Sequence, residues 1–147
     1  MKIVPDTNLI IQGLMFRGDG RKIINLAHSK KIDFYGSENS FKEAFRVFKY
    51  TKFKKILDGN FYTPEKILIS YKSIVNLITI DKKYKNKKYV DADADDDEFI
   101  RIAKTVNAKL IISNDKHLKN IKKIDDIRIV DSKTFLKIYP KLLGKTF

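Results

Sequence analysis

The chain begins with Met1-Lys2-Ile3-Val4-Pro5-Asp6-Thr7-Asn8, a short apolar run that ends at an aspartate. The same arrangement returns late in the chain, where Leu110-Ile111-Ile112 is followed by Ser113-Asn114-Asp115. Short apolar runs bounded by polar turn residues are typical of strands buried inside a sheet. The two runs therefore predict two buried strands, each followed closely by a carboxylate.

Predicted strands and helices alternate along the rest of the sequence. Apolar runs indicate further strands at 32–35, 77–80 and 127–130, and a basic loop is expected over 82–88. Such alternation predicts an α/β fold in three layers (α/β/α), with a central, mostly parallel sheet between two layers of helices. A length of 147 residues suits one domain, which we expect to span residues 1–147. Helices are expected over 7–14, 21–29, from 37 or 39 to about 50, over 63–76, from about 99 to 106, and over 132–139.

The charge balance is strongly basic. The chain has 31 Lys and Arg against 18 Asp and Glu, a formal net charge of +13, which favours a nucleic acid or anionic membrane as partner. There is no cysteine, which excludes disulfides, thiolate zinc sites and a cysteine nucleophile. No apolar run approaches the roughly 20 residues that cross a bilayer, and the N-terminus does not resemble a signal peptide. We therefore expect a cytoplasmic protein that binds no membrane.

The acidic residues stand where a metal site would form. Ligands of parallel sheets bind beyond the carboxyl ends of the strands, and Asp6 and Asp115 both follow strands. Glu43 on a predicted helix, and Asp96 or Asp97 in the acidic stretch 91–98, can approach the same place. Carboxylates gathered together repel one another unless a cation lies between them. Oxygen ligands without cysteine favour Mg²⁺ or Mn²⁺ over zinc.

A divalent ion on a basic surface is suited to phosphodiester hydrolysis. The ion lowers the pKa of a bound water and aligns it for in-line attack on the phosphorus. Because water is the nucleophile, the products would be a 5′-phosphate and a 3′-hydroxyl.

Together these motifs resemble those of the PIN-domain nucleases, and among them the toxin-like PIN proteins related to the VapC ribonucleases. The resemblance covers nearly the whole chain. Residues 3–8 are similar to the family's first strand and leading aspartate, and 40–53 to its glutamate helix with the basic turn behind it. Residues 93–103 are similar to its third acidic motif, and 110–118 to its fourth.

The resemblance assigns roles to individual residues. It implies that Asp6, Glu43, Asp96 and Asp115 bind metal, with Asp93 and Asp97 as reserves, and that the register between Asp96 and Asp97 is open. It adds Ser113 as a hydroxyl that hydrogen-bonds a ligand or water. It further implies a Mg²⁺- or Mn²⁺-dependent endoribonuclease, a homodimer and, for a toxin, a protein antitoxin that blocks the site.

Two residues depart from the family pattern. Pro5 precedes the first aspartate and lacks the backbone N–H that a central strand normally donates. Asn114 stands where related toxins often carry Gly or Arg. Neither change removes a metal ligand.

Other interpretations of the same residues stay open. Asp6 also suits a helix cap, Asp115 a turn, and Glu43 a solvated helix position. Rival functions are a PIN-fold nuclease in RNA processing or on structured DNA, a nucleic-acid-binding module without catalysis, and a phosphoacceptor domain. Two basic stretches are candidates for contacting a nucleic-acid backbone. They are Lys82, Lys83, Lys85, Lys87 and Lys88 with Tyr84 and Tyr89, and Arg46, Lys49 and Lys52.

Overall fold

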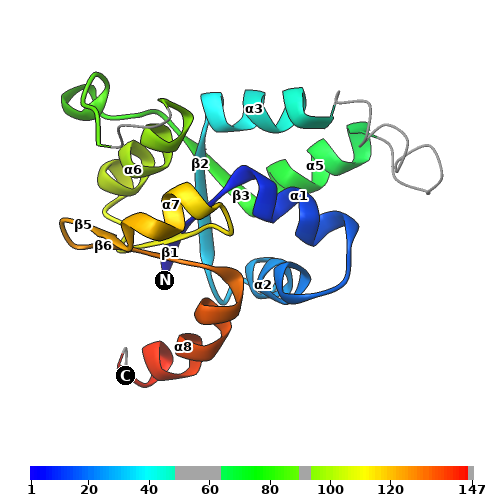
Figure 1. The fold of residues 1–147 in the computed structure, drawn as a ribbon. Helices are drawn as coiled ribbons and strands as arrows, with labels where there is room; N and C mark the ends of the chain where they lie inside the picture. Colours follow the sequence, from blue (N-terminus) through cyan, green and yellow to red (C-terminus); the bar gives the residue numbers. More distant parts are fainter. Residues whose placement is uncertain (49–63, 90–93, 146–147) are drawn as a thin grey trace.

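A six-stranded sheet runs through the molecule in the order β3-β2-β1-β4-β6-β5 (Figure 1). The computed structural model describes residues 1–48, 64–89 and 94–145. Every neighbouring pair of strands is parallel except β5 with β6 at one edge. The predicted α/β fold with a mostly parallel sheet is therefore confirmed. The strands are β1 (Lys2–Pro5), β2 (Asp33–Ser37), β3 (Val75–Ile78), β4 (Leu110–Ile112), β5 (Lys123–Ile124) and β6 (Ile127–Val130).

Helices connect the strands and cover both faces of the sheet (Figure 1). None of those in the described ranges combines the length and apolar character needed to cross a membrane. They are α1 (Thr7–Met15), α2 (Asp19–His28), α3 (Glu38–Phe48), α5 (Pro64–Ile74), α6 (Ala94–Val106), α7 (Lys116–Ile121) and α8 (Ser132–Lys145), with a 3₁₀ turn η1 (Lys82–Tyr84).

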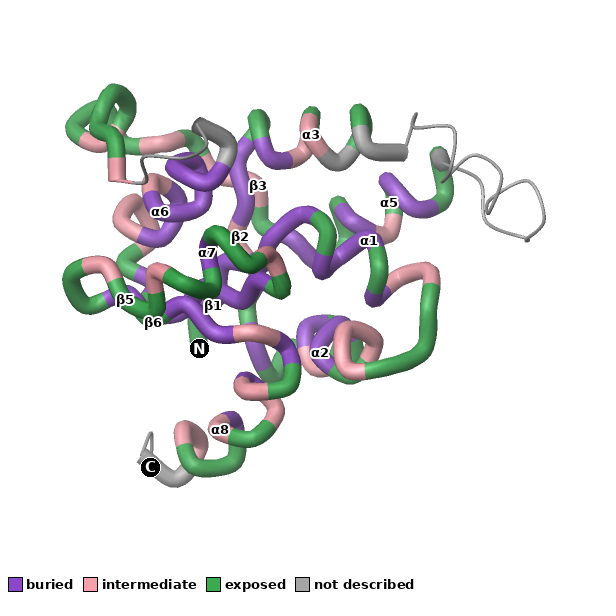
Figure 2. Tube along the Cα trace, in the orientation of Figure 1, coloured by how far each residue is buried: buried purple, intermediate pink, exposed green. Residues whose placement is uncertain are grey.

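Alternate residues of each central strand point to opposite faces, as the strand period of two requires. Ile3 packs with α1, α2, α5 and α8, whereas its neighbour Val4 packs with α6 and α7. In β4, Ile112 joins the first core and Ile111 the second. All four side chains are fully buried, and Figure 2 shows the same concentration of burial along the central elements.

The strand order reverses between β1 and β4, and this reversal positions the acidic residues. From β1 the chain moves outward to β2 and β3, and then returns to the other side of β1 as β4. Val4 pairs with Ile111 and Pro5 with Ile112, so both strands end at the same level. The N–H of Asp6 continues the ladder by donating to the Ile112 carbonyl at 2.9 Å. The chain therefore leaves the sheet at two adjacent points, after Pro5 and after Ile112, where ligands of such folds bind.

Pro5 is accommodated because it is the last residue of its strand. Pairing of β1 with β2 involves Lys2 and Ile3, whereas pairing with β4 involves Val4 and Pro5. Backbone groups of successive residues point to alternate sides of a strand, so the N–H that proline lacks is one that would face β2. The N–H that Pro5 lacks would therefore lie where the hydrogen bonds between β1 and β2 have already ended.

Several boundaries differ from the sequence-based expectations. Helix α5 ends at Ile74 and β3 begins at Val75, two residues before the expected start, because Val75 pairs with Phe34 of β2. Helix α8 continues through Pro140 to Lys145, since apolar residues beyond the proline pack on the core. Helix α7 and strand β5 were not expected, because six and two residues are too short to show a periodic pattern. The predicted end of α3 near residue 50 lies outside the described residues.

The closest approach of α1 to α2 depends on Gly13. A Cβ added there would lie 2.6 Å from Cγ1 of Ile24 and 2.8 Å from the carbonyl oxygen of Gly20. Because that oxygen belongs to the backbone, a rotamer change cannot relieve the clash. We expect Gly13→Ala to lower the free energy of unfolding in urea by roughly 1–3 kcal/mol, despite the better helix propensity of alanine.

The control is Asn25→Ala, which likewise places an alanine in the helix pair but at an exposed position of α2. Its unfolding free energy should stay within about 0.5 kcal/mol of the wild type. Equal stability of the two variants would contradict the account of this helix contact.

Candidate active site

Asp6 lies buried between the end of β1 and the start of α1, with 6% of its surface exposed. Its Oδ1 accepts the N–H of Asn8 at 3.3 Å, which caps α1. Its Oδ2 accepts the hydroxyl of Ser113 at 2.7 Å. Asp6 therefore caps α1 with one carboxylate oxygen. Capping does not explain its other oxygen, which binds Ser113.

Ser113 connects the ends of the two strands. It is fully buried directly after β4, and its N–H donates to the Val130 carbonyl of β6 at 2.9 Å. Its Oγ donates to Asp6 and accepts the N–H of Asp115 at 3.0 Å. One hydroxyl thus joins two residues that are far apart in the sequence.

Asp115 is the N-cap of α7, and its Oδ1 accepts the N–H of His117 at 2.8 Å. Its side chain is half-buried. The predicted pair, Asp6 and Asp115, is therefore brought together at one edge of the sheet, with Ser113 between them.

The environment of Asp6 disfavours a negative charge. Burial raises the pKa of Asp6 above its ordinary value, and the nearby charge of Asp115 raises it further. Hydrogen bonds from Ser113 and from the backbone of Asn8 and Thr7 oppose this rise without cancelling it. A cation beside Asp6 would compensate for both the lost hydration and the nearby charge of Asp115.

Glu43 approaches the same region from α3. Its charge acts on the hydroxyl of Tyr71, a residue of α5 with 1% of its surface exposed. Burial raises the pKa of Tyr71 to about 12, the charges of Glu43 and Asp6 contribute to the rise, and a hydrogen bond with Ser40 opposes it. Since one hydroxyl senses both carboxylates, Glu43 and Asp6 lie on the same side of the molecule.

Tyr71 was not predicted as part of the site. It belongs to an apolar stripe with Ile67 and Ile74, which in the sequence indicates a core position. Only the three-dimensional arrangement shows that its hydroxyl faces the acidic residues.

The start of α6 supplies three buried acids with different surroundings. Asp97 accepts the N–H of Tyr89 at 2.7 Å and lies 3.9 Å from Arg101. Glu98 accepts the hydroxyl of Ser37 at 3.1 Å. Asp96 is buried, with 6% exposed. Asp93, the other reserve, lies outside the described residues.

The donor chemistry of this region fits a hard divalent cation. Among the residues that the structure describes, no group of three or more acids or histidines is arranged so that it could hold a metal ion. Mg²⁺ usually keeps several waters and uses only one or two carboxylates together with substrate phosphates. Asp6, destabilised as an anion, and Asp115, whose backbone N–H Ser113 links to the Asp6 carboxylate, meet that smaller requirement.

A groove runs past α3 and α6 and includes Glu43 in its lining. One cavity of about 420 Å³ is lined by Lys42, Glu43 and Arg46 of α3. A second of about 360 Å³ reaches Lys85 in the basic loop. Both are lined by Asn39, Glu98 and Arg101, so they adjoin one another. Among the described residues, one member of each basic stretch, Arg46 and Lys85, therefore lines this groove, which begins at Glu43.

The basic loop is held against α6. The guanidinium of Arg101 donates to the Lys87 carbonyl at 2.9 and 3.2 Å, and Tyr89 is fixed by Asp97. The lysines of this loop are exposed. Lys49 and Lys52 of the second basic stretch lie outside the described residues.

Comparisons with known proteins agree with this geometry. A family model described as PIN domain matches residues 2–117. A chain in the crystal structure of VapBC2 from Rickettsia felis, bound to a DNA fragment from the promoter, has a similar fold with a TM-score of 0.60. The match covers 89% of this chain and 98% of that chain at 17% sequence identity, a level that shows the fold alone. A search of curated proteins found no match.

The raised pKa of Asp6 predicts how stability depends on pH without metal. The folded protein holds this proton more tightly than the unfolded chain, so the associated stability is lost as pH rises from the ordinary value of 3.8 through the folded pKa. In chelator at neutral pH, Asp6→Asn should therefore melt at a higher temperature than the wild type. The difference should shrink as the pH is lowered.

Asp131→Asn is the matched control, and its melting temperature should shift in the opposite direction. A hydrogen bond from Lys119 lowers the pKa of Asp131, with further hydrogen bonds from Thr134, so its ionised form stabilises the fold. This variant should melt at a lower temperature than the wild type at neutral pH. Melting shifts of the same sign in both variants would contradict the electrostatic description of Asp6.

Proposed function

Since the chain belongs to the PIN domain family, we propose that it is a metal-dependent endoribonuclease whose active site is centred on Asp6, Ser113 and Asp115. PIN domains are typically nucleases and generally use divalent metal ions. The observation that carries the proposal is the Ser113 hydroxyl, which ties the buried Asp6 carboxylate to Asp115 at the carboxyl ends of two neighbouring strands. The groove that begins at Glu43 supports RNA as the substrate.

Mg²⁺ or Mn²⁺ would be held directly by Asp6 and Asp115, and Glu43 and Asp96 would contribute from α3 and α6 through waters on the ion. When bound, such an ion lowers the pKa of a coordinated water and aligns it for attack on a phosphodiester. Ser113 keeps the Asp6 carboxylate and the backbone of Asp115 in place, and burial of Asp6 limits competing water. Hydrolysis would leave a 5′-phosphate and a 3′-hydroxyl on the RNA.

Asp96 fits the role of third acid better than Asp97. The carboxylate of Asp97 accepts the N–H of Tyr89 and lies near Arg101, so its contacts fix the basic loop against α6. Moving Asp97 to a metal would leave the Tyr89 N–H without this acceptor, which carries a cost. We therefore assign Asp97 a structural role and Asp96 the role of ligand.

The RNA backbone would follow the groove from Glu43 toward Lys85. Lys42, Arg46 and Arg101 border the groove, and the net charge of +13 supplies long-range attraction. Glu38 and Glu98 also line it, so the positive charge is local to its rims rather than uniform. This arrangement suits phosphates spaced along a single strand.

We further propose that the protein is the toxin of a toxin–antitoxin pair. The similar structure is that of a VapBC2 complex on promoter DNA, and this chain covers almost all of the matched chain. By analogy, a protein antitoxin would block the Asp6–Asp115 site, and the toxin would act as a homodimer in the cytoplasm. A small antitoxin-like gene beside the coding sequence would support this part of the proposal.

Removal of either central carboxylate tests the catalytic assignment. Mutations of residues that only orient metal ligands typically cost 10–100-fold, so loss of a ligand should cost more. We expect Asp6→Asn and Asp115→Asn to reduce Mn²⁺-dependent cleavage of a mixed RNA pool at least about 100-fold, and Ser113→Ala about 10–100-fold. Mapping of the cut ends should show 5′-phosphates.

Asp126→Asn is the control for these variants, because Asp126 is exposed, pairs with Lys109 and lies away from the site. It should cleave as the wild type does. Cleavage that persists in chelator, or in Asp6→Asn at the wild-type rate, would refute the metal site. Binding without any cleavage would favour the non-catalytic module.

The groove predicts a specific change in salt dependence. We expect the double variant Lys42→Ala/Lys85→Ala to bind a single-stranded RNA more weakly in chelator. The slope of log affinity against log salt should also fall by roughly 0.7 for each phosphate contact that is lost. Lys137→Ala, at an exposed position of α8, should leave the slope unchanged. Equal slopes for both variants would place the RNA elsewhere.

A further inference from the structure

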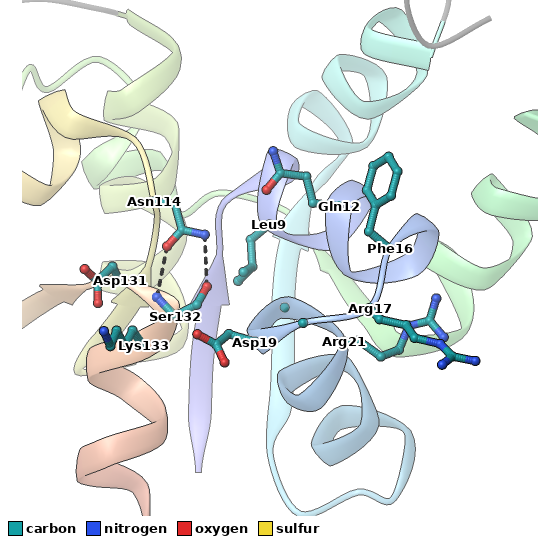
Figure 3. Close-up of a pocket in the computed structure, with 12 residues that line it drawn as sticks. Leu9, Gln12, Phe16, Arg17, Asp19, Arg21, Asn114, Asp131, Ser132 and Lys133 are labelled. Carbon is teal, nitrogen blue, oxygen red and sulfur yellow. Dashed lines mark hydrogen bonds between the residues drawn. The ribbon is translucent and has the colours of Figure 1, made fainter. Parts of the chain in front are cut away.

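Asp115 lies between two contacts that join its segment to the start of α8. On the N-terminal side, the side chain of Asn114 donates to the hydroxyl of Ser132 and accepts the Ser132 N–H, both at 3.0 Å (Figure 3). On the C-terminal side, the ammonium group of Lys119 in α7 lies 2.9 Å from the Asp131 carboxylate. Since Asp131 and Ser132 are consecutive, the chain before and after Asp115 is bound to one short segment.

This segment is itself well supported. Ser132 has 3% of its surface exposed, and the Asp131 carboxylate also accepts the N–H of Thr134 at 2.8 Å. The preceding strand, β6, is paired with β4, and the N–H of Ser113 extends that pairing by donating to the Val130 carbonyl at 2.9 Å. Asn114 therefore binds to a part of the molecule whose backbone is already held.

The side chain of Asn114 suits both of its hydrogen bonds. An amide carries a donor and an acceptor, so it can bind the hydroxyl and the backbone N–H of one residue together. Glycine, one of the residues that related toxins often carry here, has no side chain, and arginine, the other, has no acceptor. The departure from the family pattern at position 114 thus supplies a contact that neither of those residues can make.

These contacts restrict the position of Asp115. Its N–H donates to the Ser113 hydroxyl at 3.0 Å, and its Oδ1 accepts the N–H of His117 at 2.8 Å. Helix α7, which it caps, has only six residues, too few to be stable without support from the rest of the protein. A metal ligand must be held within about 0.5 Å of its productive position. Asp115 therefore depends on the bonds made by the chain on either side of it.

We propose that Asn114 and Ser132 are positioning residues that hold Asp115 in place for the divalent ion. The inference rests on the proposed metal site and does not depend on RNA being the substrate. Without the two bonds, the backbone before Asp115 gains freedom, and a bound ion must restrict that freedom again. The loss should appear in the affinity for metal, whereas binding of RNA by the groove along α3 and α6 should not change.

Titration with Mn²⁺, followed by electron paramagnetic resonance, measures this affinity without any cleavage reaction. Loss of a residue that orients a metal ligand typically costs roughly 10–100-fold in metal affinity. We expect Asn114→Ala and Asn114→Gly each to weaken Mn²⁺ binding about 10-fold. Asn114→Asp should bind Mn²⁺ at least as tightly as the wild type, because its carboxylate can accept both the N–H and the hydroxyl of Ser132.

A double-mutant cycle shows whether the contact itself is responsible. Ser132→Ala removes the hydroxyl but leaves the backbone N–H, so it should cost less than Asn114→Ala. The two substitutions together should cost no more than Asn114→Ala alone, because both remove the same contact. Asn25→Ala makes the same substitution at an exposed position of α2 and should bind Mn²⁺ as the wild type does. Melting in chelator checks that each variant folds, and if Asn114→Ala does not, Ser132→Ala and Asn114→Asp still decide.

The outcomes separate this inference from the proposed function. Wild-type Mn²⁺ affinity in Asn114→Ala, or additive losses in the double variant, would overturn the positioning role and leave the ribonuclease function standing. An equal loss of RNA affinity in chelator would show a general structural defect and would also overturn it. Weaker Mn²⁺ binding in Asn114→Ala, with no RNA cleavage by the wild type, would keep the positioning role and overturn the ribonuclease. A wild type that binds no Mn²⁺ would overturn both.

Discussion

The hydroxyl of Ser113 is the contact on which the site depends. It donates to the Asp6 carboxylate and accepts the Asp115 N–H, with heavy-atom distances of 2.7 and 3.0 Å. Both bonds require β1 and β4 to be neighbours that end at the same level, which the reversal of strand order provides. The fold therefore converts two local strand-end motifs into one pair of adjacent carboxylates.

This arrangement is unfavourable for the protein alone. Asp6 is buried, and both the loss of hydration and the charge of Asp115 raise its pKa. Functional sites commonly carry such a cost in stability, which a bound ligand relieves. A divalent cation at the carboxyl edge would supply the missing positive charge, and the basic residues along the groove would supply it to the phosphates of a nucleic acid, as proposed. The electrostatics of the site and of the surface thus favour the same partner.

Local sequence patterns were enough to predict five of the six strands and the placement of the central residues. Asp6, Ser113 and Asp115 follow apolar runs directly, so their placement at strand ends could be inferred from a few neighbouring residues. Tyr71 and Glu98 could not be found in this way, because their partners Ser40 and Ser37 lie 31 and 61 positions away and their helices show ordinary patterns. Asp96 and Asp97 are adjacent in sequence, and the choice between them depends on the contacts of Asp97 with Tyr89 and Arg101 in the structure.

An anomalous-difference map of the crystallised protein with Mn²⁺ would examine the central claim most directly. The account predicts a peak within about 2.0–2.3 Å of carboxylate oxygens from both Asp6 and Asp115, with Glu43 or Asp96 reaching it directly or through water. A map without a peak between these two aspartates, or with a peak that contacts neither of them, would contradict it.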